Sequence, residues 1–346
     1  MRVSTPWFIA GAVCLFVLIF MMFTYAKNME MSKYGGFTRN SLGSTSEQEQ
    51  ALAHRVFHGS VNGVFEENRQ SVVSMQQFQP QQISQNRNPQ FDYKTAMKEL
   101  IDKNTPGDDP KLVEMIRDYY IQQPSLEPYK LDFPNRLEFS NGQTPFIDSR
   151  LNYIEGGFYV ECGALNGEKG SNSLFFEKVR KWNGLLIEAD PSNYGVLKTK
   201  NRKAFSVNAC LSPRSTPAKL TFNKAFNRGR IVHDQSAKDW IKRQKIAADP
   251  VEIECFPFYS FMLALNRTTI DFFSLDVEGD ELNVLKTIPF DKLNIKMLAV
   301  EYVHGTGGHG QLQTYMEGKG YDTLLKMQRD DGGVNDLIFR KKGLIH

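Results

Sequence analysis

The stretch from Gly157 to Asp190 constrains the fold of this chain more than any other. An apolar run, Phe158 to Val160, ends in Glu161; a glycine-bearing turn and a helical pattern follow, and a second apolar run ends in Glu188. Glycines let the backbone approach a ligand, and the start of a helix offers free N–H groups. A carboxylate at the tip of the second strand can hold two ribose hydroxyls. The stretch therefore predicts a site for a nucleoside-bearing cofactor.

Two later apolar runs also end in acidic residues. The run that starts at Ile270 leads into Asp276 and Glu278, and the run that starts at Met297 leads into Glu301 and His304. In an open parallel sheet, ligands bind outside the carboxyl ends of the strands, so we expect these side chains at one shared site. The pattern predicts an α/β fold with a mostly parallel, doubly wound sheet. Further strands are expected at 204–211, 219–222 and 251–256, and a helix at 257–265.

Four of these segments together resemble the FkbM-type S-adenosylmethionine-dependent methyltransferases. They read VECGALNGE (160–168), LIEADP (186–191), SLDVEGDE (274–281) and VEYVH (300–304). The resemblance runs from about residue 150 to the end of the sequence. It implies the Rossmann-like methyltransferase fold, with S-adenosylmethionine as cofactor.

The resemblance also implies roles for individual residues. Glu161, Gly163, Ala164 and Asn166 would line the methionyl end of the cofactor, Glu188 would hold the ribose, Asn208 would border the adenine and Asp276 would close the site.

Removing a proton from an acceptor hydroxyl needs a general base, and the candidates at predicted strand tips are Asp276, Glu301 and His304. Alternatively, His304 lies in a mobile loop. Glu278 and Asp280 have two interpretations of equal weight, a catalytic role or charge at a helix start. We expect no metal; the competing interpretation has Asp276, Glu278, Glu301 and His304 holding Mg²⁺.

A narrower resemblance concerns segments 108–120 and 171–191, which are similar to the Star-like regulators of EGF receptor signalling. That resemblance implies a single-pass membrane protein. It would assist EGF-like ligand precursors to leave the endoplasmic reticulum and move through Golgi and endosomes. The first hypothesis is therefore a Star-like regulator built on a methyltransferase domain. The alternative is an active membrane-anchored O-methyltransferase of unknown acceptor.

An apolar N-terminal segment, residues 7–26, is long enough to cross a hydrocarbon core of about 30 Å. We interpret it as a signal-anchor, with a cleaved signal peptide as the alternative. The expected organisation is then a tail (1–6), the anchor (7–26), a flexible Gln-rich stalk (27–90), a helical extension (91–135) and the methyltransferase domain (136–346). Helices are expected at 91–103 and 109–122 in the extension, with Asp109 as an N-cap.

The side of the membrane is not decided by the charges that flank the anchor. The sequon at Asn266 favours the lumen and predicts glycosylation there, so we expect type II topology with a luminal C-terminal domain. In an oxidising lumen, Cys210 and Cys255 are the pair we would expect to form a disulfide. The net charge of +3 is too small to indicate a nucleic-acid partner.

Overall fold

The computed structural model describes residues 80–305, 308–328 and 335–344. The predicted signal-anchor and residues 27–79 of the stalk lie outside these ranges. Within them, no helix is both long and apolar enough to span a bilayer. Residues 46–327 and 334–346 group into one compact unit, which is the unit described below; of the second group, 1–45 with 328–333, only Gln328 is described.

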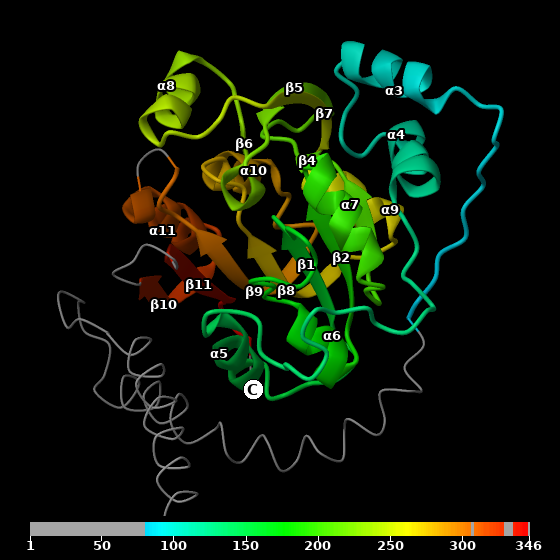
Figure 1. The fold of residues 1–346 in the computed structure, drawn as a ribbon. Coiled ribbons are helices and arrows are strands. Elements are labelled where there is room, and N and C mark those ends of the chain that lie inside the picture. The colour runs from blue at the N-terminus through cyan, green and yellow to red at the C-terminus, as the bar shows by residue number, and fades with distance from the viewer. Residues whose placement is uncertain (1–79, 306–307, 329–334, 345–346) are drawn as a thin grey trace, which may run out of the picture. The chain divides into compact units, whose positions relative to one another are not determined.

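A seven-stranded sheet forms the centre of the unit, in the order β10-β11-β9-β8-β1-β2-β3 (Figure 1). Its strands are β1 (Phe158–Cys162), β2 (Asn183–Glu188), β3 (Phe205–Asn208), β8 (Thr269–Leu275), β9 (Asn294–Glu301), β10 (Tyr321–Gln328) and β11 (Asn335–Lys341). The five strands from β9 to β3 are parallel, but β11 runs antiparallel to β9. The sheet is therefore mixed and mostly parallel, as the sequence predicts, although strands β10 and β11 were not predicted. Too few residues separate β10 from β11 for the crossover that a parallel neighbour requires.

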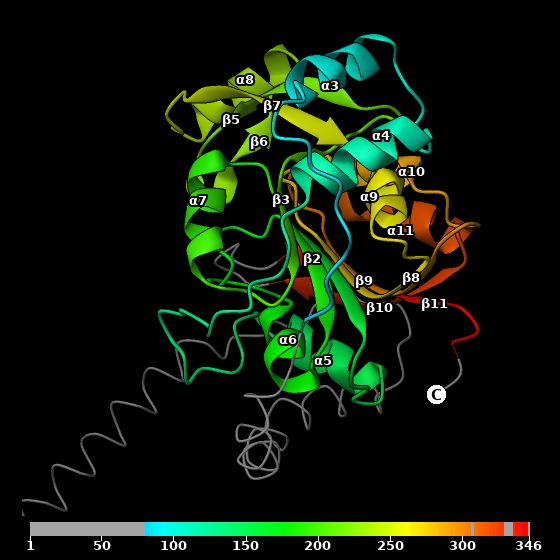
Figure 2. The same cartoon turned by 90° about the vertical axis from the view of Figure 1, so that its right-hand side faces the viewer.

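Helices lie on both faces of this sheet (Figures 1 and 2). Successive strand residues point to opposite faces, so Val160 joins one apolar cluster and Tyr159 the other. One cluster includes side chains of α5 (Gln143–Arg150), α6 (Leu174–Arg180) and α7 (Pro191–Thr199). The other includes side chains of α9 (Phe258–Ala264), α10 (Glu281–Thr287) and α11 (Gly308–Gly318). This two-sided burial is the doubly wound arrangement that the apolar runs predict.

A second, four-stranded sheet begins where β3 ends. Its order is β4-β7-β5-β6, with β4 (Cys210–Leu211), β5 (Ala218–Asn223), β6 (Arg230–Ile231) and β7 (Pro250–Phe256). Between its strands lie the 3-10 turn η3 (Phe226–Arg228) and α8 (Gln235–Arg243). The single strand expected at 204–211 is thus divided between two sheets. Because the division follows Asn208, the small sheet stands at the carboxyl edge of the large one (Figure 2).

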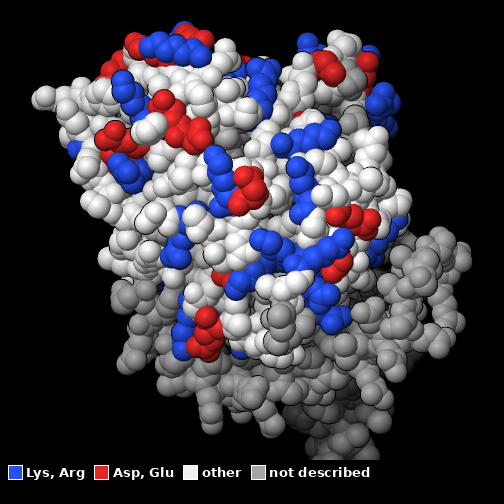
Figure 3. Space-filling model, turned by 180° about the vertical axis from the view of Figure 1, so that it is seen from behind, with Lys and Arg blue, Asp and Glu red and all other residues white. Residues whose placement is uncertain are grey.

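The helical extension packs into the same core as the large sheet. It contains α3 (Tyr93–Asp102), α4 (Pro110–Met115) and a π-helical turn, η2 (Ile116–Tyr120). Asp109 caps α4 by accepting from the N–H groups of Lys111 and Leu112, as its position before Pro110 predicts. Leu112 and Ile116 are fully buried in the cluster that contains α9. The surface that faces away from the viewer in Figure 1 carries both basic and acidic side chains (Figure 3).

Candidate functional site

Four strand ends bring the predicted site residues to one edge of the large sheet. In the strand register, Cys162 at the end of β1 pairs with Ile187 of β2 and with Leu275 of β8. Glu188 pairs with Asn208 at the end of β3. The tips of β8, β1, β2 and β3 are therefore adjacent, as the recurrence of acids after apolar runs predicts.

Gly163 starts the turn after β1 in a conformation that requires glycine. Its φ is +83°, and a Cβ atom added there would lie 2.1 Å from the backbone oxygen of Asp276. Its N–H donates to the carbonyl of Ile187 at 3.0 Å, while the residue itself is exposed. The turn thus passes close to β8 and presents bare backbone to solvent, which is the approach that a bound ligand needs.

Glu188 is 5% exposed at the end of β2 and holds this turn in place. Its Oε2 accepts from the N–H of Leu165 at 2.7 Å, and its Oε1 accepts from the N–H of Asp190 at 2.8 Å. Burial raises the pKa of the carboxyl to about 8, although these hydrogen bonds oppose the shift. Asn208 braces the same strand end, because its Nδ2 donates to the backbone oxygen of Glu188 at 2.8 Å. A carboxyl group has more hydrogen-bonding sites than these backbone donors occupy, so Glu188 can still bond to ribose hydroxyls.

Glu161 and Asn166 shape the turn through local hydrogen bonds. Glu161 is 3% exposed and accepts from the N–H of Asn172 at 2.6 Å, Ser171 Oγ at 2.8 Å and Ser173 Oγ at 2.6 Å. Asn166 Oδ1 accepts from the N–H groups of the second and third residues after it, at 3.1 and 2.8 Å. Ala164 is buried. These residues set the path of the turn, and their contacts with a cofactor stay a prediction.

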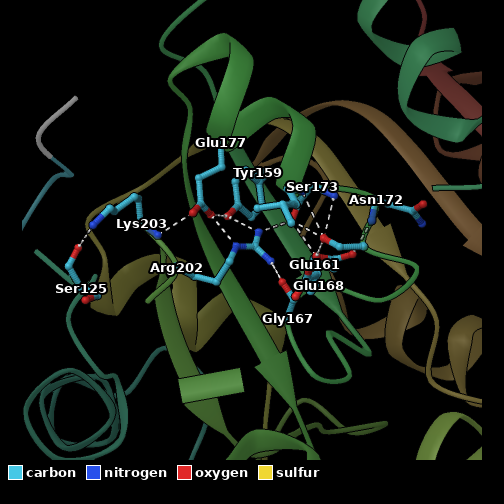
Figure 4. Close-up of polar contacts among 12 residues, drawn as sticks. Ser125, Tyr159, Glu161, Gly167, Glu168, Asn172, Ser173, Glu177, Arg202 and Lys203 are labelled. Carbon is cyan, nitrogen blue, oxygen red and sulfur yellow. Dashed lines mark hydrogen bonds and ion pairs between the residues drawn. The ribbon is translucent and has the colours of Figure 1, made fainter. Parts of the chain in front are cut away.

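A buried ion pair supports the turn from behind (Figure 4). Arg202 and Glu177 are 3% and 1% exposed, and Arg202 Nε lies 2.9 Å from Glu177 Oε2. The Arg202 guanidinium also donates to the carbonyl of Gly167 and to Tyr159 Oη and Ser173 Oγ, both at 3.1 Å. It therefore links the cofactor turn to α6 and β1. The sequence gives no signal for this pair, because Arg202 stands in the basic stretch 198–203 and neither residue marks a strand end.

Three carboxylates meet at the ends of β8 and β9. Asp276, Glu281 and Glu301 each offer one oxygen, and these oxygens lie within 4.8 Å of one another. Solvent reaches Asp276, yet enough protein surrounds its carboxyl that burial, with repulsion from Glu278 and Glu301, raises its pKa well above the usual range. Glu281 is 2% exposed and accepts from the N–H groups of Val277 and Gly279. Glu281 was not among the residues singled out from the sequence.

His304 forms ion pairs with two acidic side chains. Its Nδ1 lies 2.8 Å from Glu278 Oε2 and 3.2 Å from Glu301 Oε1. Burial alone would lower the pKa of His304, but the two carboxylates raise it to about 10. A protonated imidazole cannot take a proton from an acceptor, so Asp276 fits the predicted base role better.

The segment between β5 and β7 contacts the loops that follow β8 and β9. Arg230 Nη2 lies against Gly279, and the Arg230 guanidinium stacks on Trp240 with 4.3 Å between Cζ and the ring centroid. Trp240 meets the ring of His304 edge-on at 5.4 Å, and His233 Nε2 lies 2.7 Å from Asp280 Oδ2. This segment is therefore part of the wall at the acidic side of the site.

The remaining predicted residues are the cysteines and the glycosylation sequon. A disulfide joins Cys210 and Cys255, which are register partners in β4 and β7 with their Cα atoms 4.4 Å apart. Cys162 is buried and unpaired. Asn266 is exposed, with φ +52°, in the turn before β8. That turn lies at the amino end of β8, opposite the site.

Residues 161–323 match the family model described as the methyltransferase FkbM domain. The chain carries an FkbM methyltransferase domain. This match includes every strand tip described above, from Glu161 to His304. No curated protein matched the chain.

Among solved structures, the chain is similar to methyltransferase FkbM from Methylobacillus flagellatus KT at 16% identity and a TM-score of 0.35, over 79% of this chain and 59% of that one. Precorrin-6y C5,15-methyltransferase from Geobacter metallireducens GS-15 is 11% identical at a TM-score of 0.30, over 62% of this chain and 94% of that one. Coclaurine N-methyltransferase, bound to N-methylheliamine and SAH, is 10% identical at a TM-score of 0.23, over 73% of this chain and 62% of that one. Similarities at this level say nothing about substrate or partners.

Proposed function

We propose that the FkbM domain is an S-adenosylmethionine-dependent methyltransferase that acts on an oxygen acceptor. The observation that carries the proposal is the open turn at Gly163 between the tips of β1, β2 and β8, with the carboxylate of Glu188 beside it. A Cβ atom would fill the space at Gly163, and an acidic group at the end of β2 suits a pair of ribose hydroxyls. The donor set therefore fits this cofactor.

The residues around the site would act by positioning and by proton transfer. When bound, S-adenosylmethionine supplies an electrophilic methyl group on a sulfonium. Gly163 leaves room for it, and Glu188 would orient its ribose. Asp276 is the solvent-accessible carboxylate next to the turn, so it can accept the proton of an acceptor hydroxyl. Trp240 and Arg230 would form part of the wall against which the acceptor lies.

Calorimetric titration of the purified protein with S-adenosylmethionine, and with its demethylated product, tests the proposal. We expect binding in the range of about 1–100 μM. Glu188→Ala should weaken it by about ten- to a hundredfold, because the variant loses two hydrogen bonds to the ribose hydroxyls that contribute about 0.5–1.5 kcal/mol each. Glu99→Ala, at an exposed site in α3, should bind as the wild type does. A folded wild type that binds neither ligand would refute the proposal.

A second proposal follows from the resemblance of segments 108–120 and 171–191 to Star-like regulators. In it the protein is a single-pass type II membrane protein of endoplasmic reticulum, Golgi and endosomes, anchored by residues 7–26. Its luminal domain assists EGF-like ligand precursors and uses the methyltransferase fold as a binding module. Two observations support a luminal domain: the disulfide between Cys210 and Cys255, and the exposed sequon at Asn266. A glycan there would project from the edge opposite the strand tips.

Glycosylation in cells tests the luminal placement. We expect endoglycosidase treatment to shift the gel mobility of the wild type and of Thr268→Ser, which keeps the sequon. Asn266→Gln should show no shift. If the wild type and Thr268→Ser also fail to shift, the domain is not exposed to the glycosylation machinery, and the luminal placement in the second proposal is rejected.

A further inference from the structure

The carboxylates at the ends of β8 and β9 gather more negative charge than the ion pairs of the described residues balance. Asp276, Glu281 and Glu301 bring their oxygens within 4.8 Å of one another, and Glu278 lies beside them. Among the described residues, the one ion pair of these three carboxylates joins Glu301 to His304, and His304 also pairs with Glu278. A single imidazolium can balance the charge of only one of these four carboxyl groups, so the others require bound protons or a bound cation.

One oxygen of Glu301 lacks a donor. The Glu301 side chain is 9% exposed; its Oε1 accepts from the N–H of Val303 at 3.3 Å and lies 3.2 Å from His304 Nδ1. Its Oε2 is buried and has no hydrogen-bond partner. A buried carboxylate oxygen left without a partner costs free energy. An oxygen of Glu301 lies within 4.8 Å of oxygens of both Asp276 and Glu281, so this group faces the cluster.

We propose that Asp276, Glu281 and Glu301 hold a divalent cation of the Mg²⁺ or Mn²⁺ class. An octahedral ion bound at about 2.0–2.1 Å places adjacent ligands about 2.9 Å apart and opposite ligands about 4.2 Å apart, and at most one pair of three ligands can be opposite. The oxygens, within 4.8 Å of one another, would therefore draw together when the ion binds. The three ligands are all carboxylates, and oxygen ligands select hard cations over zinc or copper. Backbone donors from Val277 and Gly279 fix the Glu281 carboxylate in place.

The role of this cation rests on the proposed function. Asp276 touches the Gly163 turn through its backbone, so a cation on its carboxylate would stand beside the methyl donor. Coordination to a divalent cation lowers the pKa of a hydroxyl. The O–H bond of the acceptor would then break and its proton would pass to water. The oxygen would form a bond to the methyl carbon as the bond from that carbon to the sulfonium sulfur breaks, and the electron pair of the broken bond would stay on sulfur. With the cation bound, Asp276 is a ligand and solvent takes the proton.

Titration of the full-length protein with MnCl₂, followed by the electron paramagnetic resonance signal of free Mn²⁺, tests the site without cofactor. We expect one site per chain that MgCl₂ competes for. Loss of a single ligand should weaken Mn²⁺ binding at least ten- to a hundredfold, the range seen when only supporting residues are changed. Asp276→Asn and Glu301→Gln should both show this loss. Glu252→Gln, at an exposed acid of β7, should leave the affinity unchanged.

The outcomes separate this inference from the proposed function. Near-UV circular dichroism will check that Asp276→Asn and Glu301→Gln are folded. No Mn²⁺ binding by the wild type, or unchanged binding in both variants, overturns the cation site. S-adenosylmethionine affinity measured in chelator reports on the cofactor site alone. Cofactor binding without Mn²⁺ binding rejects only the cation, whereas the reverse result rejects only the methyltransferase proposal.

Discussion

Replacing Arg202 with methionine should lower the free energy of unfolding by about 3–5 kcal/mol. The substitution leaves the Glu177 carboxylate, 1% exposed, without its charged partner in the interior. Tyr159 Oη and the N–H of Lys203 still donate to Glu177, but neither supplies a compensating charge. Breaking a buried pair costs more than the pair itself contributes, because the remaining ion stays desolvated. Urea unfolding of the purified variant measures the loss.

An exposed ion pair of the same chain provides the control. Lys103 Nζ lies 3.5 Å from Glu99 Oε2 in α3, and both side chains are more than half exposed. Lys103→Met should therefore cost less than about 1 kcal/mol. The double variant Arg202→Met with Glu177→Met should recover part of the stability, since no charge then remains buried. Equal losses in Arg202→Met and Lys103→Met would show that the buried pair does not hold the turn.

The strand tips were predictable because their signals are local. An apolar run that ends in an acid marks both a buried strand and its carboxyl end, so Glu161, Glu188 and Asp276 could be assigned from the sequence. Parallel pairing then places such ends together without any knowledge of the loops. The same reasoning identified Gly163, whose position requires a glycine for a reason that the structure supplies.

The sequence offered Asp276, Glu278, Glu301 and His304 as a competing metal-ligand set, although no metal was expected. The three carboxylates that the structure brings together include Glu281 in place of Glu278. The φ values of Glu278 and Gly279, 59° and 121°, reverse the backbone after β8, so the alternation along the strand does not extend to these residues. Glu278 turns to His304, and Glu281 at the start of α10 takes its place in the cluster.

Other features depend on contacts between distant parts of the sequence. The run 204–211 looks like one strand, since alternation does not change where β3 leaves one sheet and β4 enters another. Arg202 and Glu177 are separated by 25 positions, so only the folded chain shows that they meet. The helix α5 was missed because Pro145 suggests a break, although a proline in the first turn of a helix is tolerated.

Gly163→Ala should disrupt both the fold of the turn and the cofactor site. A residue with a side chain at φ +83° carries backbone strain of about 1–3 kcal/mol. The added Cβ would also lie 2.1 Å from the backbone oxygen of Asp276, so β8 or the turn must move, at a further cost of about 1–3 kcal/mol. We expect a loss of unfolding free energy of about 2–6 kcal/mol from these two terms. Calorimetry should detect no S-adenosylmethionine binding.

Gly195→Ala is the matched control for this change. Gly195 lies inside α7, and a Cβ atom there would meet no atom within 4 Å. The same substitution should therefore stabilise the protein by about 0.5–1 kcal/mol, because alanine has the higher helix propensity and loses less entropy on folding. Opposite signs for the two glycines in urea unfolding would tie the loss to the contact between Gly163 and Asp276. If Gly163→Ala is as stable as Gly195→Ala and still binds cofactor, the turn does not approach β8 as closely as the structure shows. The close approach at Gly163 would then no longer support the proposed cofactor site.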